Sequence, residues 1–273
     1  MTSSQEFFID MFRDYLKGKV SDSVSYEYIR IVRKFMESAR NISQTDEDAM
    51  KGVATEFLNI ENPNSYRNTL AALKKLFEFI GQPQTLGNFK YKATMPSFSI
   101  ATPSLEEMQI FGKAIENDRI RVYYYLGVVS AIRPEHLLRL TVKLFDKRNN
   151  MINTWMKTYG KKNFFFSFYT PEIKPIIEKY IEALPDNEKL FLLGMRYIQK
   201  EFRDASKKSG IKIVPKMMRK FATNWFRRHG MIPEDVDVIT SHMPQSIVAR
   251  HYMDVSRIRE EYDKATKDLK LIV

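Results

Sequence analysis

The sequence contains no cysteine, and this absence removes several kinds of chemistry at once. Without cysteine there are no disulfides, no thiol nucleophile and no zinc site with thiolate ligands. Histidine is also scarce, with four residues in 273, and these show no HExxH-like spacing of metal ligands. The sequence therefore predicts no metal site, and the lack of cysteine suits a reducing cytosol.

Long apolar runs are missing as well. The longest stretches, such as YYYLGVVSAI at 123–132, fall far short of the roughly 20 residues that a helix needs to cross a bilayer. The N-terminal stretch MTSSQEFFIDMFRDY carries acidic residues and has no apolar core, so no signal peptide is expected. These features predict a cytoplasmic protein without a membrane partner.

What the sequence has in excess is positive charge. Lysine and arginine number 44 against 33 acidic residues, which gives a net charge of +11 at pH 7. Such a surplus favours a polyanionic partner, nucleic acid first of all, although a generic basic surface explains the charge equally well. The charges are distributed through sequence with a regular apolar period, and 44% of all residues are hydrophobic, so a folded basic face is expected.

The first hundred residues have the pattern of a small helical bundle. Four amphipathic segments are expected to form helices, at about 3–19, 23–39, 45–60 and 64–81. Two of them begin with capping signals, Ser3 followed by Glu6 and Thr45 followed by Asp48, and Gly81 is placed to end the fourth. Residues 90–103 contain two prolines and no helical period, which predicts an interdomain linker after a first domain at 1–98.

The second region, residues 99–273, is expected to be helical around one small β element. A capping box from Ser104 to Glu107 opens it, and Pro171 after Thr170 is expected to be the first residue of a helix. Residues 151–170 form two aromatic and β-branched runs around a turn, which predicts a hairpin with a third short strand near 143–145. Helices are expected at about 105–116, 119–130, 134–140, 171–183, 193–208, 215–229, 245–252 and 255–268. The predicted fold class is mainly α with a small β-hairpin or sheet.

Four pieces of this second region carry candidate functional residues. Arg133 enters a helix in SAIRPEHLLRL, and the hairpin turn MKTYGKK offers lysines. In PKMMRKFATNWF, Lys216 and Arg219 lie one helical turn apart and therefore share a face. The fourth piece, SHMPQSIVARHYMD, places His242 ten positions before Tyr252.

This order of arginine, hairpin lysine, K-x-x-R, histidine and tyrosine resembles the tyrosine recombinases, the phage-integrase family. Its most specific part is KMMRKFAT followed about 20 residues later by SHMPQSIVARHY, where the family usually has HxLRHxFAT and LGHxxxxxTxxY. The resemblance covers nearly the whole chain. It implies a helical core-binding domain at 1–98 and a catalytic domain with a C-terminal tail helix at 99–273.

The sequence departs from the family pattern at several positions. Lys216 and Lys220 stand where histidines are usual, His136 stands at a usually acidic position, and Ser241 replaces a glycine. Lysine at the first of these positions is similar to the integrases of archaeal spindle-shaped viruses, which indicates an archaeal mobile element. Loss of the acid leaves open what orients the neighbouring side chains. His136 and His251 are interpreted as structural, and the aromatic run FFFSFY as a core strand.

The resemblance implies that the Tyr252 hydroxyl attacks a DNA phosphodiester and leaves a 3′-phosphotyrosine and a free 5′-hydroxyl. Neither a metal nor another cofactor is then required. Arg133 and Arg219 would grip the non-bridging oxygens, because a guanidinium binds two oxygens at once and stays charged. His242 would donate a hydrogen bond to the same phosphate, and Lys216 would add a point charge.

A lysine of the hairpin turn would protonate the leaving 5′-oxygen. Lys157, Lys161 and Lys162 are the candidates. Lys157 is preferred because Met156-Lys157-Thr158 resembles the KTG form of this turn in several integrases, and because it follows Arg133 by 24 residues.

The implied partner is duplex DNA with specific recombination sites, clamped between two domains in a cytoplasmic, nucleoid-associated protein. Strand exchange between two duplexes implies a homotetramer on DNA. The charged tail after Tyr252 is expected to dock on a neighbouring protomer. Three alternatives stay open: a Xer-like resolvase of chromosome dimers or plasmids, a type IB topoisomerase-like enzyme, and a non-catalytic helical DNA-binding protein.

Overall fold

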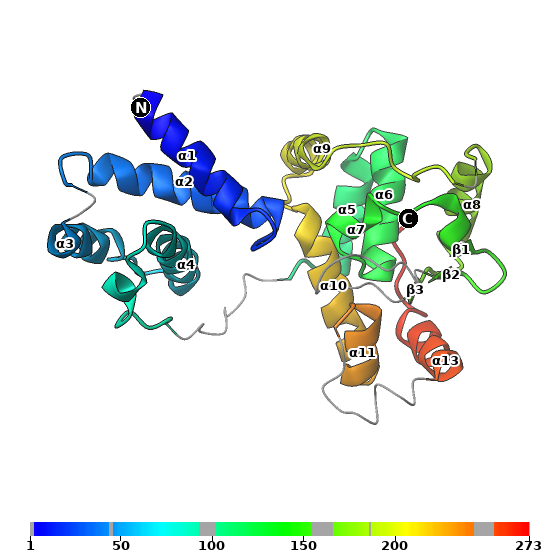
Figure 1. Ribbon diagram of the computed structural model, residues 1–273. Helices are drawn as coiled ribbons and strands as arrows, with labels where there is room; N and C mark the ends of the chain where they lie inside the picture. The colour runs from blue at the N-terminus through cyan, green and yellow to red at the C-terminus, as the bar shows by residue number, and fades with distance from the viewer. Residues whose placement is uncertain are drawn as a thin grey trace. The chain divides into compact units, whose positions relative to one another are not determined.

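The computed structural model describes residues 3–43, 46–92, 102–153, 166–185, 187–242 and 254–272. The chain divides into two compact units, Met1–Phe98 and Ser99–Val273 (Figure 1). Each unit has a hydrophobic core of its own. That these units are a core-binding domain and a catalytic domain stays a prediction.

The first unit is a bundle of four helices, as the sequence predicted. They are α1 (Ser3–Leu16), α2 (Asp22–Ser38), α3 (Glu47–Phe57) and α4 (Pro63–Phe79), followed by the 3₁₀ helix η1 (Pro83–Leu86). Asp46, rather than Thr45, caps α3, because its carboxylate accepts from the backbone N–H of Ala49. Gly81 follows α4 with a φ of 80°, the left-handed conformation that glycine adopts without strain, so the predicted helix stop is confirmed.

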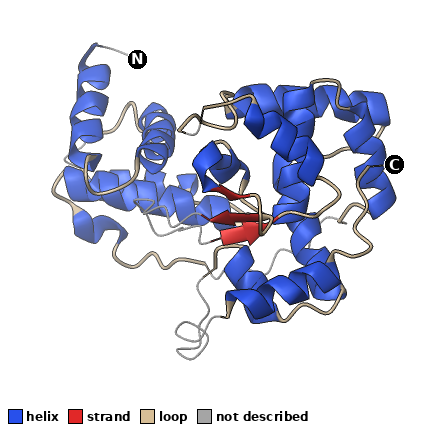
Figure 2. Cartoon of the chain, turned by 90° about the vertical axis from the view of Figure 1, so that its right-hand side faces the viewer, coloured by secondary structure: helices blue, strands red, loops and turns tan. Residues whose placement is uncertain are grey.

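The second unit is mainly helical around a three-stranded antiparallel sheet, which confirms the predicted fold class (Figure 2). The strands are β1 (Phe145–Asp146), β2 (Met151–Asn153) and β3 (Phe166–Phe168), in that order across the sheet. The helices are α5 (Leu105–Ala114), α6 (Asp118–Ser130), α7 (Pro134–Leu137), η2 (Val142–Leu144), α8 (Lys174–Glu182), α9 (Met195–Ser209), α10 (Pro215–Arg228), α11 (Pro233–Ile239) and α13 (Val255–Ala265). None of the helices in the described ranges combines the length and apolar character that crossing a membrane requires.

Several predicted boundaries were wrong. Pro171 is not the first residue of a helix, because Thr170–Ile173 form a turn in which the Thr170 carbonyl accepts from Ile173 and Lys174, and α8 begins only at Lys174. The strand that was predicted near 143–145 is β1. It begins only at Phe145, because the residues before it form the 3₁₀ helix η2. The helix α11 was not predicted at all. The predicted hairpin turn and the helix at 245–252 lie outside the described residues.

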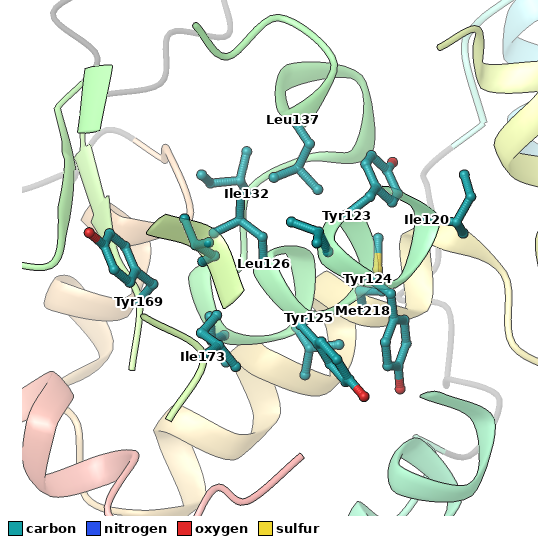
Figure 3. Close-up of a cluster of buried hydrophobic side chains, with 14 of the residues drawn as sticks. Ile120, Tyr123, Tyr124, Tyr125, Leu126, Ile132, Leu137, Tyr169, Ile173 and Met218 are labelled. Atoms are coloured by element: carbon teal, nitrogen blue, oxygen red, sulfur yellow. The ribbon is translucent and has the colours of Figure 1, made fainter. Parts of the chain in front are cut away.

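The contact between α6 and α10 positions the loops that carry the candidate site. Gly127 lies in the middle of α6, and a Cβ atom there would come within 2.8 Å of the Met218 side chain and 3.0 Å of Leu137. A larger residue at position 127 would therefore require the ends of the Met218 and Leu137 side chains to move. Figure 3 shows Met218 among the buried side chains that α6 contributes to the core. Because Arg219 follows Met218 directly, this packing also fixes where Arg219 leaves its helix.

The end of the aromatic run FFFSFY is a core strand, as predicted. Phe166, Phe168 and Tyr169 are almost completely buried. The backbone of β3 pairs with β2 in the register Met151↔Phe168 and Asn153↔Phe166.

The C-terminal helix α13 belongs to the core of its own unit. Ile258, Tyr262 and Ala265 are buried, and the Tyr262 hydroxyl donates to the carbonyl of Val129 at 2.9 Å. In the single chain these residues pack within their own unit, and the expected docking on a neighbouring protomer stays a prediction. Their apolar side chains fill space against α10 and β3 within the same unit, so deleting residues 256–273 would remove core and not only an assembly contact.

The last described residues continue along the same unit. The backbone N–H groups of Leu271 and Ile272 donate to the Glu172 carboxylate at 3.1 and 2.9 Å, and Gln109 donates to the carbonyl of Lys270 at 2.7 Å. Glu172, which was predicted to lie in a helical first turn, instead anchors the C-terminal segment.

Candidate active site

The Arg133 side chain extends from a turn that is fixed by buried hydrogen bonds. Arg133 is the N-cap residue of α7, and Ala131 before it adopts a left-handed φ of 53°. Ser167 of β3 donates to the carbonyl of Ser130 at 2.6 Å, and Tyr123 donates to the carbonyl of Pro134 at 3.1 Å. The sheet and α6 therefore hold the turn on both sides of Arg133. Its Nη1 atom is buried and has no hydrogen-bond partner among the described residues.

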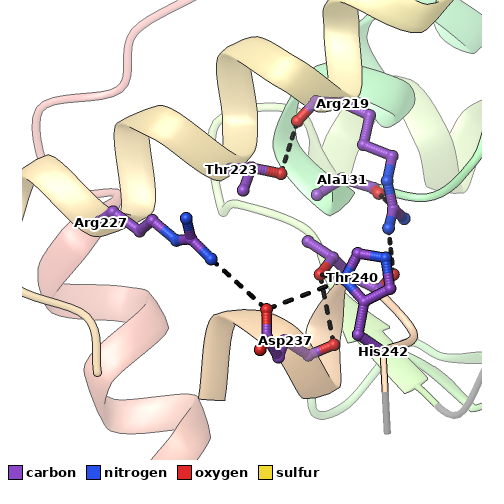
Figure 4. Close-up of polar contacts among 7 residues, drawn as sticks. All are labelled: Ala131, Arg219, Thr223, Arg227, Asp237, Thr240 and His242. Atoms are coloured by element: carbon purple, nitrogen blue, oxygen red, sulfur yellow. Dashed lines mark hydrogen bonds and ion pairs between the residues drawn. The ribbon is translucent and has the colours of Figure 1, made fainter. Parts of the chain in front are cut away.

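Arg219 joins two segments that are far apart in sequence. From α10 its Nη1 donates to the carbonyl of Ala131 at 3.0 Å, and its Nη2 donates to the carbonyl of Thr240 (Figure 4). Ala131 precedes Arg133 by two residues, and Thr240 precedes His242 by two. One guanidinium thus ties together the turns that carry the other two predicted phosphate ligands.

His242 is positioned by the C-terminal cap of α11. The backbone N–H of His242 donates to the carbonyl of Asp237 at 2.7 Å, and that of Ser241 donates to Val238 at 2.9 Å. With Ser241 at a φ of 60°, these two bonds form a Schellman motif. A left-handed residue is required at this point of the cap, which explains why glycine suits the position and why serine is strained there. The cap places His242 in a fixed relation to the last turn of α11.

The arginines and His242 form one electrostatic cluster. Burial and the neighbouring Arg133 lower the pKa of Arg219 to about 10, which still leaves it charged at neutral pH. Burial, Arg219 and Arg133 lower the pKa of His242, while Asp237 opposes this shift. Like charges held together in a partly buried place are unfavourable until an anion joins them. The cluster therefore has the electrostatics of an anion site.

The structure brings together three of the six predicted catalytic residues. Arg133, Arg219 and His242 interact as described above. Lys216 lies on α10 three residues before Arg219 and is exposed to solvent. Lys157 and Tyr252 lie outside the described residues, as do the alternative lysines Lys161 and Lys162 and the neighbouring His251. Within the described ranges, no three His, Asp or Glu side chains gather in a way that holds a metal ion.

His136 does not supply the charge of the acid that the family pattern has at this position. It is half-buried, and burial together with Arg133 and Arg139 lowers its pKa. The carboxylate that faces His242 belongs to Asp237 of α11, which the sequence reasoning missed, and Glu135 of α7 also lies near Arg133 and Arg219. Figure 4 shows Asp237 between Arg227, whose Nη2 lies 3.4 Å from Oδ1, and His242, whose Nδ1 lies 3.8 Å from the same oxygen. The proline at the start of α11 and its acidic first turn were the available signals.

Comparison with known proteins agrees with this architecture. No protein-family model matches the chain. In sequence, the chain is 30% identical over 128 residues to tyrosine recombinase XerA of Saccharolobus solfataricus, a match that covers 46% of this chain and 43% of XerA. The chain thus spans less than half the length of the curated relative that it matches.

Structural similarity extends over most of the chain. The Tn1549 transposon integrase, in complex with transposon right-end DNA, matches with a TM-score of 0.62 at 13% identity, covering 94% of this chain and 98% of that one. A lambda integrase dimer bound to a core site matches with a TM-score of 0.59 at 12% identity, covering 93% and 98%. The chain has the tyrosine recombinase fold.

In this recombinase fold, an ion-pair clamp connects the helices on either side of residues 243–253. Arg257 of α13 donates to both carboxylate oxygens of Asp235 in α11, at 2.6 and 2.8 Å, and to Glu261 at 2.8 Å. Glu261 in turn accepts from the backbone N–H of Ile232. The Asp235 side chain is only 6% exposed. The clamp therefore fixes both ends of the segment that carries Tyr252 to the same unit.

Replacing Arg257 by alanine is expected to lower the free energy of unfolding by about 2 kcal/mol, because the buried Asp235 carboxylate loses both N–H donors. Denaturant unfolding measures this change. The double variant D235N/R257Q removes both charges together and is expected to recover part of the loss. Wild-type stability in R257A would show that the clamp contributes nothing.

Proposed function

We propose that the protein is a site-specific tyrosine recombinase that cleaves and rejoins duplex DNA. In this reaction the Tyr252 hydroxyl attacks a backbone phosphorus, the bond to the 5′-oxygen breaks, and a 3′-phosphotyrosine forms. The covalent intermediate conserves the phosphodiester energy, so a second 5′-hydroxyl reverses the step and joins the strands. The observation that carries this proposal is the cluster of Arg133, Arg219 and His242.

The cluster supports phosphoryl transfer because negative charge develops on the non-bridging oxygens in the transition state. Fixed cations that need no rearrangement at that moment give the largest stabilisation. Two carbonyls hold the guanidinium of Arg219, which is therefore preorganised, and the backbone of Arg133 is fixed as the N-cap of α7. In the proposed site Lys216 adds a further positive charge, and a hairpin lysine, Lys157 in preference to Lys161 or Lys162, protonates the departing 5′-oxygen.

Most of the other tyrosines of this unit are unsuited to act as the nucleophile. Five of those in described residues are buried, and burial raises the pKa of each: Tyr123, Tyr124, Tyr125, Tyr169 and Tyr262. Burial also raises the pKa of Tyr180, which stacks on Phe191, whereas Tyr197 is exposed and its hydroxyl accepts from Asn117. A buried phenol resists the loss of its proton and cannot reach DNA. Tyr159 and Tyr252 are the two tyrosines of the unit that lie outside the described residues.

The first unit offers a surface suited to the DNA backbone. On its α1 and α2 helices, Arg13, Lys17 and Arg30 each pair with a carboxylate one turn away. By contrast, Arg67 and Lys74 of α4 lie over the ring of Tyr91, and Lys92 lies over the ring of Tyr66. Within the described residues, no carboxylate forms an ion pair with these three cations or with Lys90. We call Arg67, Lys74, Lys90 and Lys92 the α4 cation surface, and its uncompensated charge favours phosphate contacts.

Neutralising part of the α4 cation surface is expected to lower the affinity for DNA. It is also expected to make that affinity less dependent on salt concentration. Each lost phosphate contact reduces the slope of log K against log salt concentration by about 0.9, so the variant R67Q/K90Q/K92Q is expected to lose about 2 to 3 units of slope. Fluorescence anisotropy over a salt series measures this slope. The control R13Q/K17Q/R30Q makes the same change in net charge at ion-paired positions. Equal losses in both variants would contradict a specific role of this surface.

We infer duplex DNA with specific recombination sites as the substrate, a homotetramer as the active assembly, and a cytoplasmic, nucleoid-associated enzyme of an archaeal mobile element. The lysine at position 216 and the match to an archaeal recombinase support this setting.

A Xer-like resolvase is the second candidate, and the sequence match to XerA is the observation that favours it. Both candidates use the same chemistry and differ in the sites they join. A plasmid with two directly repeated sites is resolved into two circles by either enzyme, whereas joining an attachment site on a separate circle to the chromosome indicates an integrase.

Trapping a covalent protein–DNA adduct tests the proposed function. A suicide duplex, nicked near the cleavage site, loses a short fragment after attack and prevents rejoining. Denaturation with SDS is then expected to leave the protein attached to the 3′-phosphate end. Tetramer formation on DNA separates a recombinase from a topoisomerase-like enzyme, and the absence of an adduct on a cognate site would favour a non-catalytic DNA-binding protein.

A further inference from the structure

Asp237 and His242 are brought together by the helix cap and not by chance proximity of two loops. Asp237 is the third residue from the end of α11, and His242 is the second residue beyond its cap, the two positions that a Schellman motif places next to each other. These positions commonly carry apolar side chains that touch. Here they carry a carboxylate and an imidazole, whose Oδ1 and Nδ1 atoms lie 3.8 Å apart.

Two oxygen atoms, one from Thr240 and one from Asp237, lie beside Nδ1 of the imidazole ring. The Thr240 hydroxyl donates its single proton to the carbonyl of Asp237 at 3.2 Å. The same hydroxyl oxygen lies 3.3 Å from Nδ1 of His242, and the Asp237 carboxylate, which can only accept, lies 3.8 Å from Nδ1. A proton on Nδ1 suits both contacts, and Nε2 is then the nitrogen left to face a ligand.

We infer that Asp237 is a positioning residue of the reaction: its carboxylate and the Thr240 hydroxyl hold the Nδ1 side of His242, so that Nε2 faces the scissile phosphate. This inference rests on the proposed function. When Nε2 is also protonated, the ring donates from Nε2 to a phosphate oxygen, and the Asp237 carboxylate stabilises the resulting positive charge. The same division of labour, one carboxylate orienting one imidazole, operates in hydrolytic triads.

A carboxylate is needed here because every other charged group facing His242 opposes its protonation. Arg219 from α10 and Arg133 from the turn before α7 both lower the pKa of His242, and so does burial. Asp237 from α11 is the group that raises it. Asp237 therefore provides the negative charge beside His242.

Arg227 supports Asp237 from the opposite side. Its Nη2 lies 3.4 Å from the oxygen that faces His242, and both side chains are partly exposed. Asp237 thus has one partner on α10 and one beyond the cap of α11. The Asp237 side chain is 39% exposed, so substitutions there are expected to leave the fold intact.

The experiment compares wild type with D237N, D237E and E234Q. Glu234 lies exposed on the same helix, so E234Q makes the same charge change without touching His242. NMR of the histidine side-chain nitrogens in DNA-free protein reports the tautomer and titration midpoint of His242. Only four histidines are present, and loss of one signal in H242Q assigns it. Single-turnover cleavage of the suicide duplex at saturating protein reports the chemical step.

D237N is expected to lower the titration midpoint of His242, because a negative charge beside the imidazolium is removed. It is also expected to slow cleavage by about 10- to 100-fold while DNA affinity changes by less than about twofold. D237E is expected to restore part of both properties, and E234Q to match wild type. An unchanged midpoint or an unchanged cleavage rate in D237N overturns the inference. If the wild-type protein forms no adduct, the proposed function fails. The NMR comparison of wild type with D237N still shows whether Asp237 acts on the His242 ring.

Discussion

Tyr252→Phe is expected to abolish the covalent protein–DNA adduct. The substitution removes one oxygen atom and keeps the ring, so the nucleophile disappears while packing around it changes little. Loss of a nucleophile lowers turnover by at least about 10⁴-fold, which places adduct formation below detection in a gel assay. DNA affinity is expected to stay within about twofold of wild type, because the phosphate ligands remain. SDS-resistant label transfer from a suicide duplex measures the adduct.

Tyr159→Phe is the matched control for this experiment. Tyr159 is the other tyrosine of the second unit that lies outside the described residues. The Y159F variant is expected to form the adduct at the wild-type rate. An adduct that survives in Y252F and disappears in Y159F would move the nucleophile to the hairpin turn and contradict the proposed arrangement of the site.

Arg219→Ala is expected to reduce cleavage by about 10³-fold, the range found when one preorganised charge is removed from a phosphoryl-transfer or oxyanion site. Its guanidinium is placed between the turns of Arg133 and His242, so removal takes away a cation and loosens both turns. R219K keeps the charge and is expected to recover only part of the rate, because an ammonium cannot bind in the bidentate manner. Single-turnover cleavage at saturating protein measures the effect.

Arg228→Ala controls for the loss of one positive charge from the same helix. Arg228 is exposed at the end of α10. The R228A variant is expected to cleave DNA at nearly the wild-type rate. Because R219A also leaves the Ala131 and Thr240 carbonyls without their donor, its thermal unfolding must be recorded beside the rate. A folded R219A protein that cleaves at the wild-type rate would remove Arg219 from the mechanism.

Local signals in the sequence were sufficient for most of the helices. The Ser104–Glu107 capping box is present, and Gly81 ends α4 in the left-handed conformation. The start of α8 was misplaced, because the Pro171 signal competes with a turn held by the Thr170 carbonyl, and because Glu172 binds the C-terminal backbone. That competition involves residues about 100 positions apart, which a local pattern does not contain.

The site was predictable where it depends on chemistry and unpredictable where it depends on backbone geometry. The resemblance to the tyrosine recombinases selected Arg133, Arg219 and His242, and the fold brings their charges together. Asp237 was missed because α11 has seven residues and too few turns for a recognisable apolar stripe. Its relation to His242 arises from the left-handed Ser241 in the cap, a backbone conformation that serine rarely adopts.

Mass spectrometry of the trapped adduct tests the central claim most directly. Trypsin cuts after Arg250 and Arg257, so Tyr252 lies in the short peptide HYMDVSR. After nuclease digestion of the attached DNA, this peptide is expected to carry a nucleotide linked through its 3′-phosphate to the tyrosine oxygen. A nucleotide on any other peptide, or a 5′-phosphate linkage, would contradict the account.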